Sequence, residues 1–81
     1  MGSNLNSTIK QRLGLNIAHY RQRNGWSLAH LAEIAQISTF FILYIERGSR
    51  GASLETIELL THALKIDVAD LFVIPSENET S

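Results

Sequence analysis

The sequence predicts an all-α domain of five short helices. Apolar residues recur at three- and four-residue intervals along most of the 81-residue chain, and this spacing is typical of helices that bury one face. Residues that favour helix caps separate these periodic stretches. The chain has no cysteine, and its one proline, Pro75, follows the last apolar cluster. We therefore expect a fold that depends on helix packing alone, without disulfides or thiolate metal sites.

The first predicted helix begins at Ile9 and ends at Asn24-Gly25. Gly14 lies inside it, although a glycine there costs about 1 kcal/mol relative to alanine. We expect this small residue to permit close packing against another element. The apolar stripe of the helix comprises Ile9, Leu13, Ile17 and Tyr20.

The second predicted helix, Leu28–Ala35, follows Ser27 as its N-cap. A tight turn over 36–38 leads to a third helix, Thr39–Arg47. The run Thr-Phe-Phe-Ile-Leu-Tyr-Ile in that helix favours a strand by local propensity. No other segment offers a partner strand, and a lone strand leaves its backbone groups unsatisfied. We therefore predict a helix that ends with Gly48 as its C′ glycine.

The fourth predicted helix, Leu54–Leu64, follows the N-cap Ser53. Asp67 is expected to cap a short fifth helix, Val68–Phe72. The domain then spans 9–74, between a flexible arm over 1–8 and a disordered polar tail over 75–81. The inner stripe of the fourth helix comprises Leu54, Ile57, Leu60 and Leu64.

Charge divides the chain into two unlike parts. Six basic and two acidic residues lie between Met1 and Ser53, for a net charge of +4, whereas one basic and six acidic residues follow, for −5. This asymmetry predicts two faces with different partners. The longest apolar run has six residues, too few for a bilayer span of about 20. Because no signal segment opens the chain, we expect a cytoplasmic protein with no membrane partner.

Neither a catalytic nor a metal-binding constellation is visible. The three histidines, His19, His30 and His62, lie on different predicted helices and lack the spacing of a zinc site. No nucleophile elbow surrounds any serine, and the segment 48–51 is too short and too late for a phosphate-binding loop. We therefore predict a protein that is not an enzyme and needs no cofactor.

Two short helices joined by a three-residue turn form a helix-turn-helix arrangement. Ile45-Glu46-Arg47-Gly48 follows Leu31-Ala32 at a characteristic distance. Further matching positions are Gly14, Ile17, Arg21, Gly25, Trp26-Ser27, Ile37-Ser38, Ile42, Ser53-Leu54, Ile57, Ala63-Leu64 and Leu71-Phe72. Over Leu13–Phe72 the chain thus resembles the Cro/C1-type (XRE-like) helix-turn-helix regulators, a family that includes lambdoid phage repressors and restriction–modification controller proteins.

The resemblance implies a compact five-helix, lambda-repressor-like domain that binds double-stranded DNA. It also implies that the protein acts as a homodimer, which would occupy a pseudo-palindromic operator and repress or activate an adjacent promoter. RNA polymerase is therefore a further expected partner. In size the chain is closest to the restriction–modification controllers. The resemblance also implies that Arg21 and Glu46 form a buried ion pair that supports the third helix.

Residues of the third helix, placed at 100° steps, separate into two faces. Phe41, Ile42 and Ile45 form the buried face. On the outer face, Thr39, Phe40 and Tyr44 match the family's base-reading positions, with Leu43 beside them. We expect Thr39 to hydrogen-bond a base edge, Phe40 to contact a thymine methyl, and Tyr44 to reach a base or phosphate.

Phosphate contacts are expected from both flanks of this face. The N-terminus of the second helix, at Ser27 and Leu28, offers free N–H groups. Arg47, Ser49 and Arg50 follow the third helix. Arg23 would add a peripheral contact.

The outer face departs from the family pattern because it is apolar and aromatic, where relatives usually carry Gln, Arg, Asn or Ser. Leu28 stands where many relatives have a phosphate-contacting Gln. Gln36 replaces the usual turn glycine, so a left-handed conformation there would cost about 1–2 kcal/mol. Exposed apolar patches often mark interaction surfaces. The alternative function is therefore a protein–protein interaction module, or an antitoxin-like component, that retains the fold.

The acidic C-terminal part is predicted to form the dimer interface. Glu58, Asp67 and Asp70 would rim its apolar patch and keep the patch away from phosphates. Alternatively, Leu71 and Phe72 close the core of a monomer. The predicted interface comprises Leu59, Ile66, Val68, Leu71, Phe72 and Ile74.

Overall fold

The computed structural model describes residues 8–74, which form four α-helices and one 3-10 helix with no strand in that range. The elements are α1 (Ile9–Arg23), α2 (Leu28–Ala35), α3 (Thr39–Glu46), α4 (Leu54–Leu64) and the 3-10 helix η2 (Val68–Leu71). The all-α prediction is confirmed, including a helix over the strand-like run in α3. The predictions for 1–7 and 75–81 lie outside the described residues.

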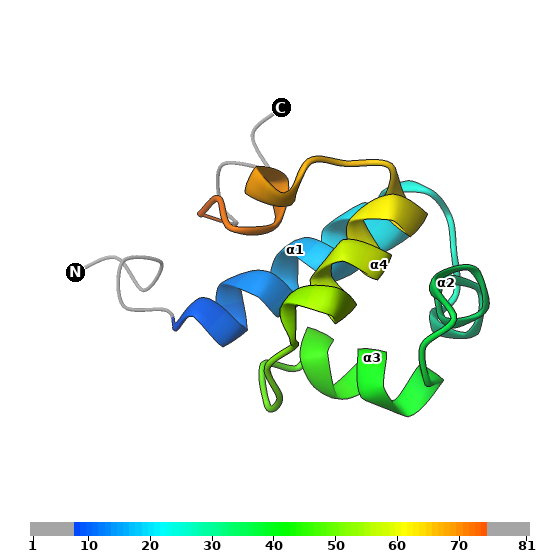
Figure 1. The fold of residues 1–81 in the computed structure, drawn as a ribbon, viewed down its shortest axis with the longest axis horizontal. Helices are drawn as coiled ribbons and strands as arrows, with labels where there is room; N and C mark the ends of the chain where they lie inside the picture. Colours follow the sequence, from blue (N-terminus) through cyan, green and yellow to red (C-terminus); the bar gives the residue numbers. More distant parts are fainter. Residues whose placement is uncertain (1–7, 75–81) are drawn as a thin grey trace.

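The helix α1 crosses the middle of the molecule and packs against α3, α4 and η2 (Figure 1). The helix α2 packs against α3 and α4. In the view of Figure 1, α3 lies along the lower edge and η2 at the upper edge, with α1 and α4 between them. The second half of the helix-turn-helix and the C-terminal segment therefore lie on opposite sides of the domain.

Each α-helix begins with a hydroxyl side chain that accepts a hydrogen bond from the backbone N–H three residues later. Ser27, Ser38 and Ser53 cap α2, α3 and α4, with oxygen–nitrogen distances between 3.0 and 3.4 Å. Thr8 caps α1 and exchanges two hydrogen bonds with Gln11. The assignment of Thr8 to a flexible arm was therefore wrong, because its side chain completes a capping box.

Two non-glycine residues end helices in the left-handed conformation. Gln36 follows α2 with φ 59° and ψ 46°, and Lys65 follows α4 with φ 57° and ψ 48°. The expected strained turn at Gln36 is thus present. Gly48 has φ 75° just after α3, which confirms its predicted role as the C′ residue.

The core draws side chains from all five elements. Two residues predicted for its inner stripes, Ile9 and Leu54, are instead 60% and 79% exposed. Each is the first residue of its helix and precedes the first buried position, so it extends past the core. The fully buried apolar side chains are Ile17, Leu31, Ile42, Ile45, Leu60 and Leu71.

The C-terminal end differs from the prediction in two ways. The fifth helix is a four-residue 3-10 turn, and Phe72 is its C-cap rather than its last helical residue. Leu71 is fully buried, so it closes the monomer core and cannot belong to a dimer interface. Phe72 is partly buried against the same core.

A polar clamp holds this end of the chain against α1. The amide nitrogen of the buried Asn16 donates to the carbonyl oxygens of Leu71 and Val73, both at 2.9 Å. Arg12 donates to the carbonyl oxygen of Phe72 at 3.4 Å. Because buried carbonyls need donors, these bonds fix the position of η2 on α1.

Candidate nucleic-acid interface

The axes of α2 and α3 bend by 115° across the turn that joins them. Ile42 and Ile45 of α3 are fully buried, whereas Phe40 and Tyr44 are 70% and 41% exposed. Thr39 and Leu43 are half-buried beside them. The predicted division of α3 into an inner and an outer face is therefore correct. We call the outer four side chains, Thr39, Phe40, Leu43 and Tyr44, the recognition surface.

An ion pair fixes α3 to α1, as the family resemblance implied. Nε of Arg21 donates to Oε2 of Glu46 at 2.7 Å, and Nη2 donates to Oε1 at 3.0 Å. The two side chains are only 13% and 9% exposed, so this bidentate contact is largely shielded from water. The hydrogen bond to Glu46 raises the pKa of Arg21 above its usual value, although burial opposes that shift. The guanidinium therefore remains charged.

Arg21 makes a third hydrogen bond, to a second partner that the sequence did not reveal. Its Nη1 donates to the carbonyl oxygen of Trp26 at 2.8 Å. Trp26 lies in the loop that leads into α2. One guanidinium thus joins α1, the entry to α2 and the end of α3, which fixes both helices of the helix-turn-helix. No residue spacing signals a contact to a backbone carbonyl.

Close packing between α1 and α3 depends on Gly14. A Cβ atom at this position would collide with the carbonyl oxygens of Ile45 and Glu46. The predicted reason for this glycine is therefore correct. Together with the ion pair, this contact sets how far α3 stands from α1.

Positive charge gathers at the C-terminal end of α3. Arg47 and Arg50 are both exposed, and the Arg50 guanidinium lies 5.4 Å from the centre of the Phe41 ring. Lys10 of α1 runs beside Gly51, with side-chain carbons 3.8 Å from where a Cβ would stand. The sequence did not indicate Lys10, because 40 residues separate it from Arg50.

The structure changes the role predicted for Ser49. Both its hydroxyl and its backbone N–H donate to the carbonyl oxygen of Tyr44, at 3.1 Å each. Ser49 therefore closes the end of α3 and has no donor left for a phosphate. The arginines on either side of it keep their exposed guanidinium groups.

The N-terminus of α2 forms the other flank of the recognition surface. The Ser27 side chain accepts from the N–H of His30 at 3.0 Å. Helix geometry leaves the N–H groups of the preceding helical residues without intrahelical acceptors. The Leu28 side chain is half-buried against the core, so only its backbone can contact a phosphate. Arg23 is exposed in the last turn of α1.

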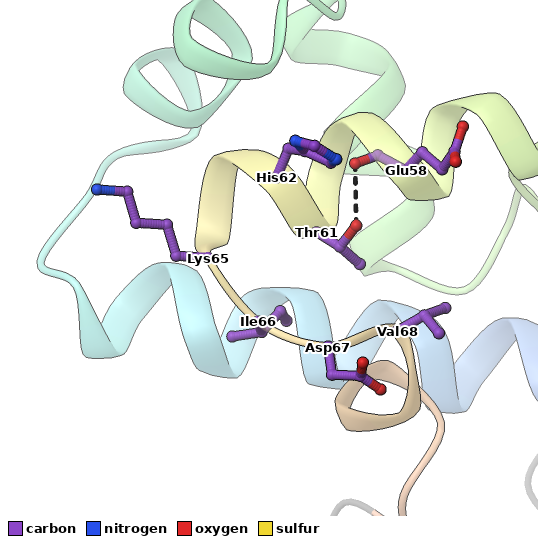
Figure 2. Close-up of a pocket in the computed structure, with 7 residues that line it drawn as sticks. All are labelled: Glu58, Thr61, His62, Lys65, Ile66, Asp67 and Val68. Atoms are coloured by element: carbon purple, nitrogen blue, oxygen red, sulfur yellow. Dashed lines mark hydrogen bonds between the residues drawn. The ribbon is translucent and has the colours of Figure 1, made fainter.

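A second surface lies on the far side of the molecule, where α4 meets η2. Leu59 and Val68 are 44% and 49% exposed, and Ile66 is half-buried. We call these three side chains the C-terminal surface. Figure 2 shows a groove between the end of α4 and the following segment. Its lining comprises Glu58, Thr61, His62, Lys65, Ile66, Asp67 and Val68.

Phe72 and Ile74, the remaining residues of the predicted interface, are half-buried at the end of the described chain. A further hollow, lined by Glu55, Glu58, Leu59 and His62, extends the groove along α4. Glu58 and Asp67 are exposed in or beside these hollows. Of the predicted acidic rim, Glu58 and Asp67 thus lie around an apolar centre, whereas the Asp70 carboxylate accepts from the backbone N–H of Asp67 at 3.0 Å.

Between residues 8 and 74, no group of three His, Cys, Asp or Glu side chains is arranged to hold a metal ion. In the same range, no single helix has both the length and the apolar character of a membrane span. Only α2 and α3 taken together have that length and apolar character, and the pair is sharply bent between them.

A family model and a known protein of similar sequence both match most of this chain. Residues 12–71 match a family described as "Helix-turn-helix domain". The chain is 36% identical over 63 residues to "Control protein C.SmaI" from Serratia marcescens, and the match covers 78% of this chain and 75% of that protein.

Solved structures with the same fold support this match. The clp gene regulator ClgR from Corynebacterium glutamicum has a TM-score of 0.80 and 27% identity, over 91% of this chain and 79% of that one. The restriction-modification controller protein C.AhdI from Aeromonas hydrophila has a TM-score of 0.75 and 30% identity, over 78% of this chain and 96% of that one.

Proposed function

The chain belongs to the helix-turn-helix domain family, and we propose that it is a transcription regulator that binds a pseudo-palindromic DNA operator as a homodimer. Within this class we propose a restriction–modification controller. That choice is supported by the identity to the control protein C.SmaI and by the likeness to the controller C.AhdI.

The observation that carries the proposal is the position of α3. Its outer face is exposed, while Ile42 and Ile45 on the inner face are fully buried. A helix with side chains is about 10–12 Å across, which suits the DNA major groove of about 12 Å. The recognition surface would then face base edges, and the 115° bend would direct the N-terminus of α2 toward the sugar–phosphate backbone.

Phosphate contacts would lie at both flanks of α3. Arg47 and Arg50 supply two exposed cations at one end, and Lys10 adds a third. The free N–H groups at the start of α2 would supply neutral donors at the other. Such contacts set the affinity and register of a DNA-binding protein but carry no sequence information.

The homodimer part of the proposal is supported by the C-terminal surface. Leu59 and Val68 expose apolar area on α4 and η2, and η2 lies at the edge of the molecule opposite α3 (Figure 1). One short recognition helix contacts few base pairs, whereas two copies about 34 Å apart would contact two half-sites. Phe72 and Ile74 would extend the contact, and the acidic rim would separate it from phosphates.

A controller acts at a promoter, so RNA polymerase is the proposed further partner and the cytoplasm the proposed site of action. The alternative is an interaction module or antitoxin-like component that uses Phe40 to hold a protein. The 70% exposure of this large apolar ring favours that alternative. The two functions make opposite predictions: the regulator binds DNA with a sequence preference, whereas the interaction module does not.

Selection of bound duplexes from a random pool tests the proposal. We expect enrichment of a pseudo-palindromic site with half-sites about one helical turn apart. The logarithm of the binding constant for this site should fall linearly with the logarithm of the salt concentration. The slope should be about −0.9 for each phosphate that the protein contacts. Recovery of no preferred sequence would contradict the proposal and favour a protein partner.

A further inference from the structure

We infer that this protein selects its DNA sites chiefly through the 5-methyl groups of thymine, with the Phe40 ring as the main contact. The inference rests on the proposed DNA binding and specifies how the same surface distinguishes base pairs.

The recognition surface lacks the groups that usually read bases. Bidentate contacts to guanine need Arg or Lys, and those to adenine need Asn or Gln. None of the four residues, Thr39, Phe40, Leu43 and Tyr44, belongs to these types. Its polar side-chain atoms are two hydroxyls, and a single hydroxyl both donates and accepts. Hydrogen bonding from this surface therefore discriminates weakly between base pairs.

The helix is unable to rotate a different face outward. Ile42 and Ile45 are fully buried, and Gly14 brings α1 against the carbonyls at the end of α3. The Arg21–Glu46 ion pair fixes the same end. The serine before α3 is held at the helix N-cap, since its hydroxyl oxygen accepts from the N–H of Phe41. The apolar face is therefore a fixed part of the fold.

Phe40 and Tyr44 are one helical turn apart, so their rings lie on the same side of α3. At 70% exposure, Phe40 is the most prominent apolar side chain of this surface. Covering exposed apolar area with an apolar partner removes that area from water, which stabilises the complex. In the major groove, the thymine methyl is the one apolar group that a base pair presents.

Charge favours DNA over a protein as that partner. Arg47 and Arg50 are exposed beyond the same helix, and Arg50 lies over the Phe41 ring at 5.4 Å. Cations at one end of an apolar strip match a groove in which thymine methyls lie between two rows of phosphates. The recognition surface thus fits thymine-containing half-sites.

The test uses the duplex recovered by selection, with single thymines replaced by deoxyuridine. Uracil pairs with adenine in the same way but lacks the methyl group. Covering one methyl stabilises by about 0.8 kcal/mol, a factor of about four in affinity. We expect the wild-type protein to bind at least one uracil-substituted site about fourfold more weakly.

Variants identify the contacting ring. Phe40→Ala should bind the thymine and uracil forms of that site equally. Leu15→Ala is the matched control, because Leu15 is 50% exposed on α1 and should retain the fourfold preference. Circular dichroism confirms that each variant is folded.

Equal binding of wild type to every uracil-substituted site would overturn the inference while leaving DNA binding intact. A fourfold preference that persists in Phe40→Ala would also overturn it. If the random pool yields no preferred site at all, the proposed function fails, and the inference fails with it. The two failures are thus distinguishable.

Discussion

The recognition surface and the C-terminal surface both expose apolar side chains, but they differ in the charges around them. Arg47, Arg50 and Lys10 lie near the end of α3. Glu58 and Asp67 lie around the groove at α4 and η2. Apolar exposure alone therefore does not identify a partner. The surrounding charge separates a surface suited to DNA from one that phosphates would repel.

The two surfaces also differ in how the fold supports them. A salt bridge, a backbone carbonyl contact and the packing at Gly14 fix α3. The end of the chain at η2 depends on neutral hydrogen bonds from Asn16. The recognition surface thus depends on a charged side chain and on close helix packing, and the C-terminal end on hydrogen bonds from a neutral amide.

Glu46→Ala is expected to have the largest effect. The substitution leaves the largely buried Arg21 guanidinium without its carboxylate partner. The free energy of unfolding should therefore fall by about 3 kcal/mol. For a domain of this size, the melting temperature should fall by more than about 10 °C. Thermal unfolding followed by circular dichroism measures the change.

Glu33→Ala is the control for this prediction. Glu33 is exposed on α2, and the loss of a surface charge should change stability by less than about 0.5 kcal/mol. A Glu46 variant as stable as this control would show that the ion pair does not stabilise the fold.

Leu59→Asp combined with Val68→Asp should disrupt the proposed dimer without unfolding the protomer. Both side chains are about half exposed, whereas two carboxylates facing their copies add repulsion to an acidic rim. We expect the dissociation constant to rise by about 100-fold, or about 2.7 kcal/mol. Sedimentation equilibrium at tens of micromolar measures it.

Ile9→Asp with Leu15→Asp provides the matched control, since these exposed apolar residues lie on α1. This variant should associate as the wild type does. A wild-type protein that is monomeric at these concentrations, or a Leu59/Val68 variant that still dimerises, would rule out the C-terminal surface as the interface.

Arg47→Ala with Arg50→Ala should weaken binding to all DNA sequences by similar factors. Each lost phosphate contact lowers the salt slope by about 0.9, so the loss of affinity between about 50 and 200 mM salt should become roughly tenfold smaller. Lys65→Ala removes a cation from the groove at the end of α4 and should leave the slope unchanged. An unchanged slope in the arginine variant would show that neither side chain contacts the backbone.

Helix positions were predictable because caps and periodicity are local. Ser27 and Ser53 stand at the N-caps where the sequence indicated them. The strand-like α3 was recognised as a helix because a lone strand lacks a partner. Single end positions were less predictable: Ile9 and Leu54 match the helical period but extend past the core.

The site was predictable in part for the same reason. The faces of α3 follow from its periodicity, and the Arg21–Glu46 pair from the family resemblance. The carbonyl contact of Arg21, the double donation by Ser49 and the approach of Lys10 all depend on tertiary geometry. Leu71 was misassigned because periodicity cannot tell an intramolecular apolar contact from an intermolecular one.

The smallest predicted effect comes from a matched pair of substitutions, one at the end of α2 and one at the end of α4. Gln36 and Lys65 have nearly the same left-handed backbone angles. A side chain in this conformation is strained by about 1–2 kcal/mol, whereas glycine loses more entropy on folding. Gln36→Gly and Lys65→Gly should therefore each raise stability by about 0.5–1 kcal/mol, as measured by urea unfolding. Since both side chains are exposed, the two gains should be equal and additive in the double variant. A gain at Lys65 alone would indicate that the Gln36 side chain stabilises the turn between α2 and α3, and that the recognition side depends on more than its ion pair and its packing against α1.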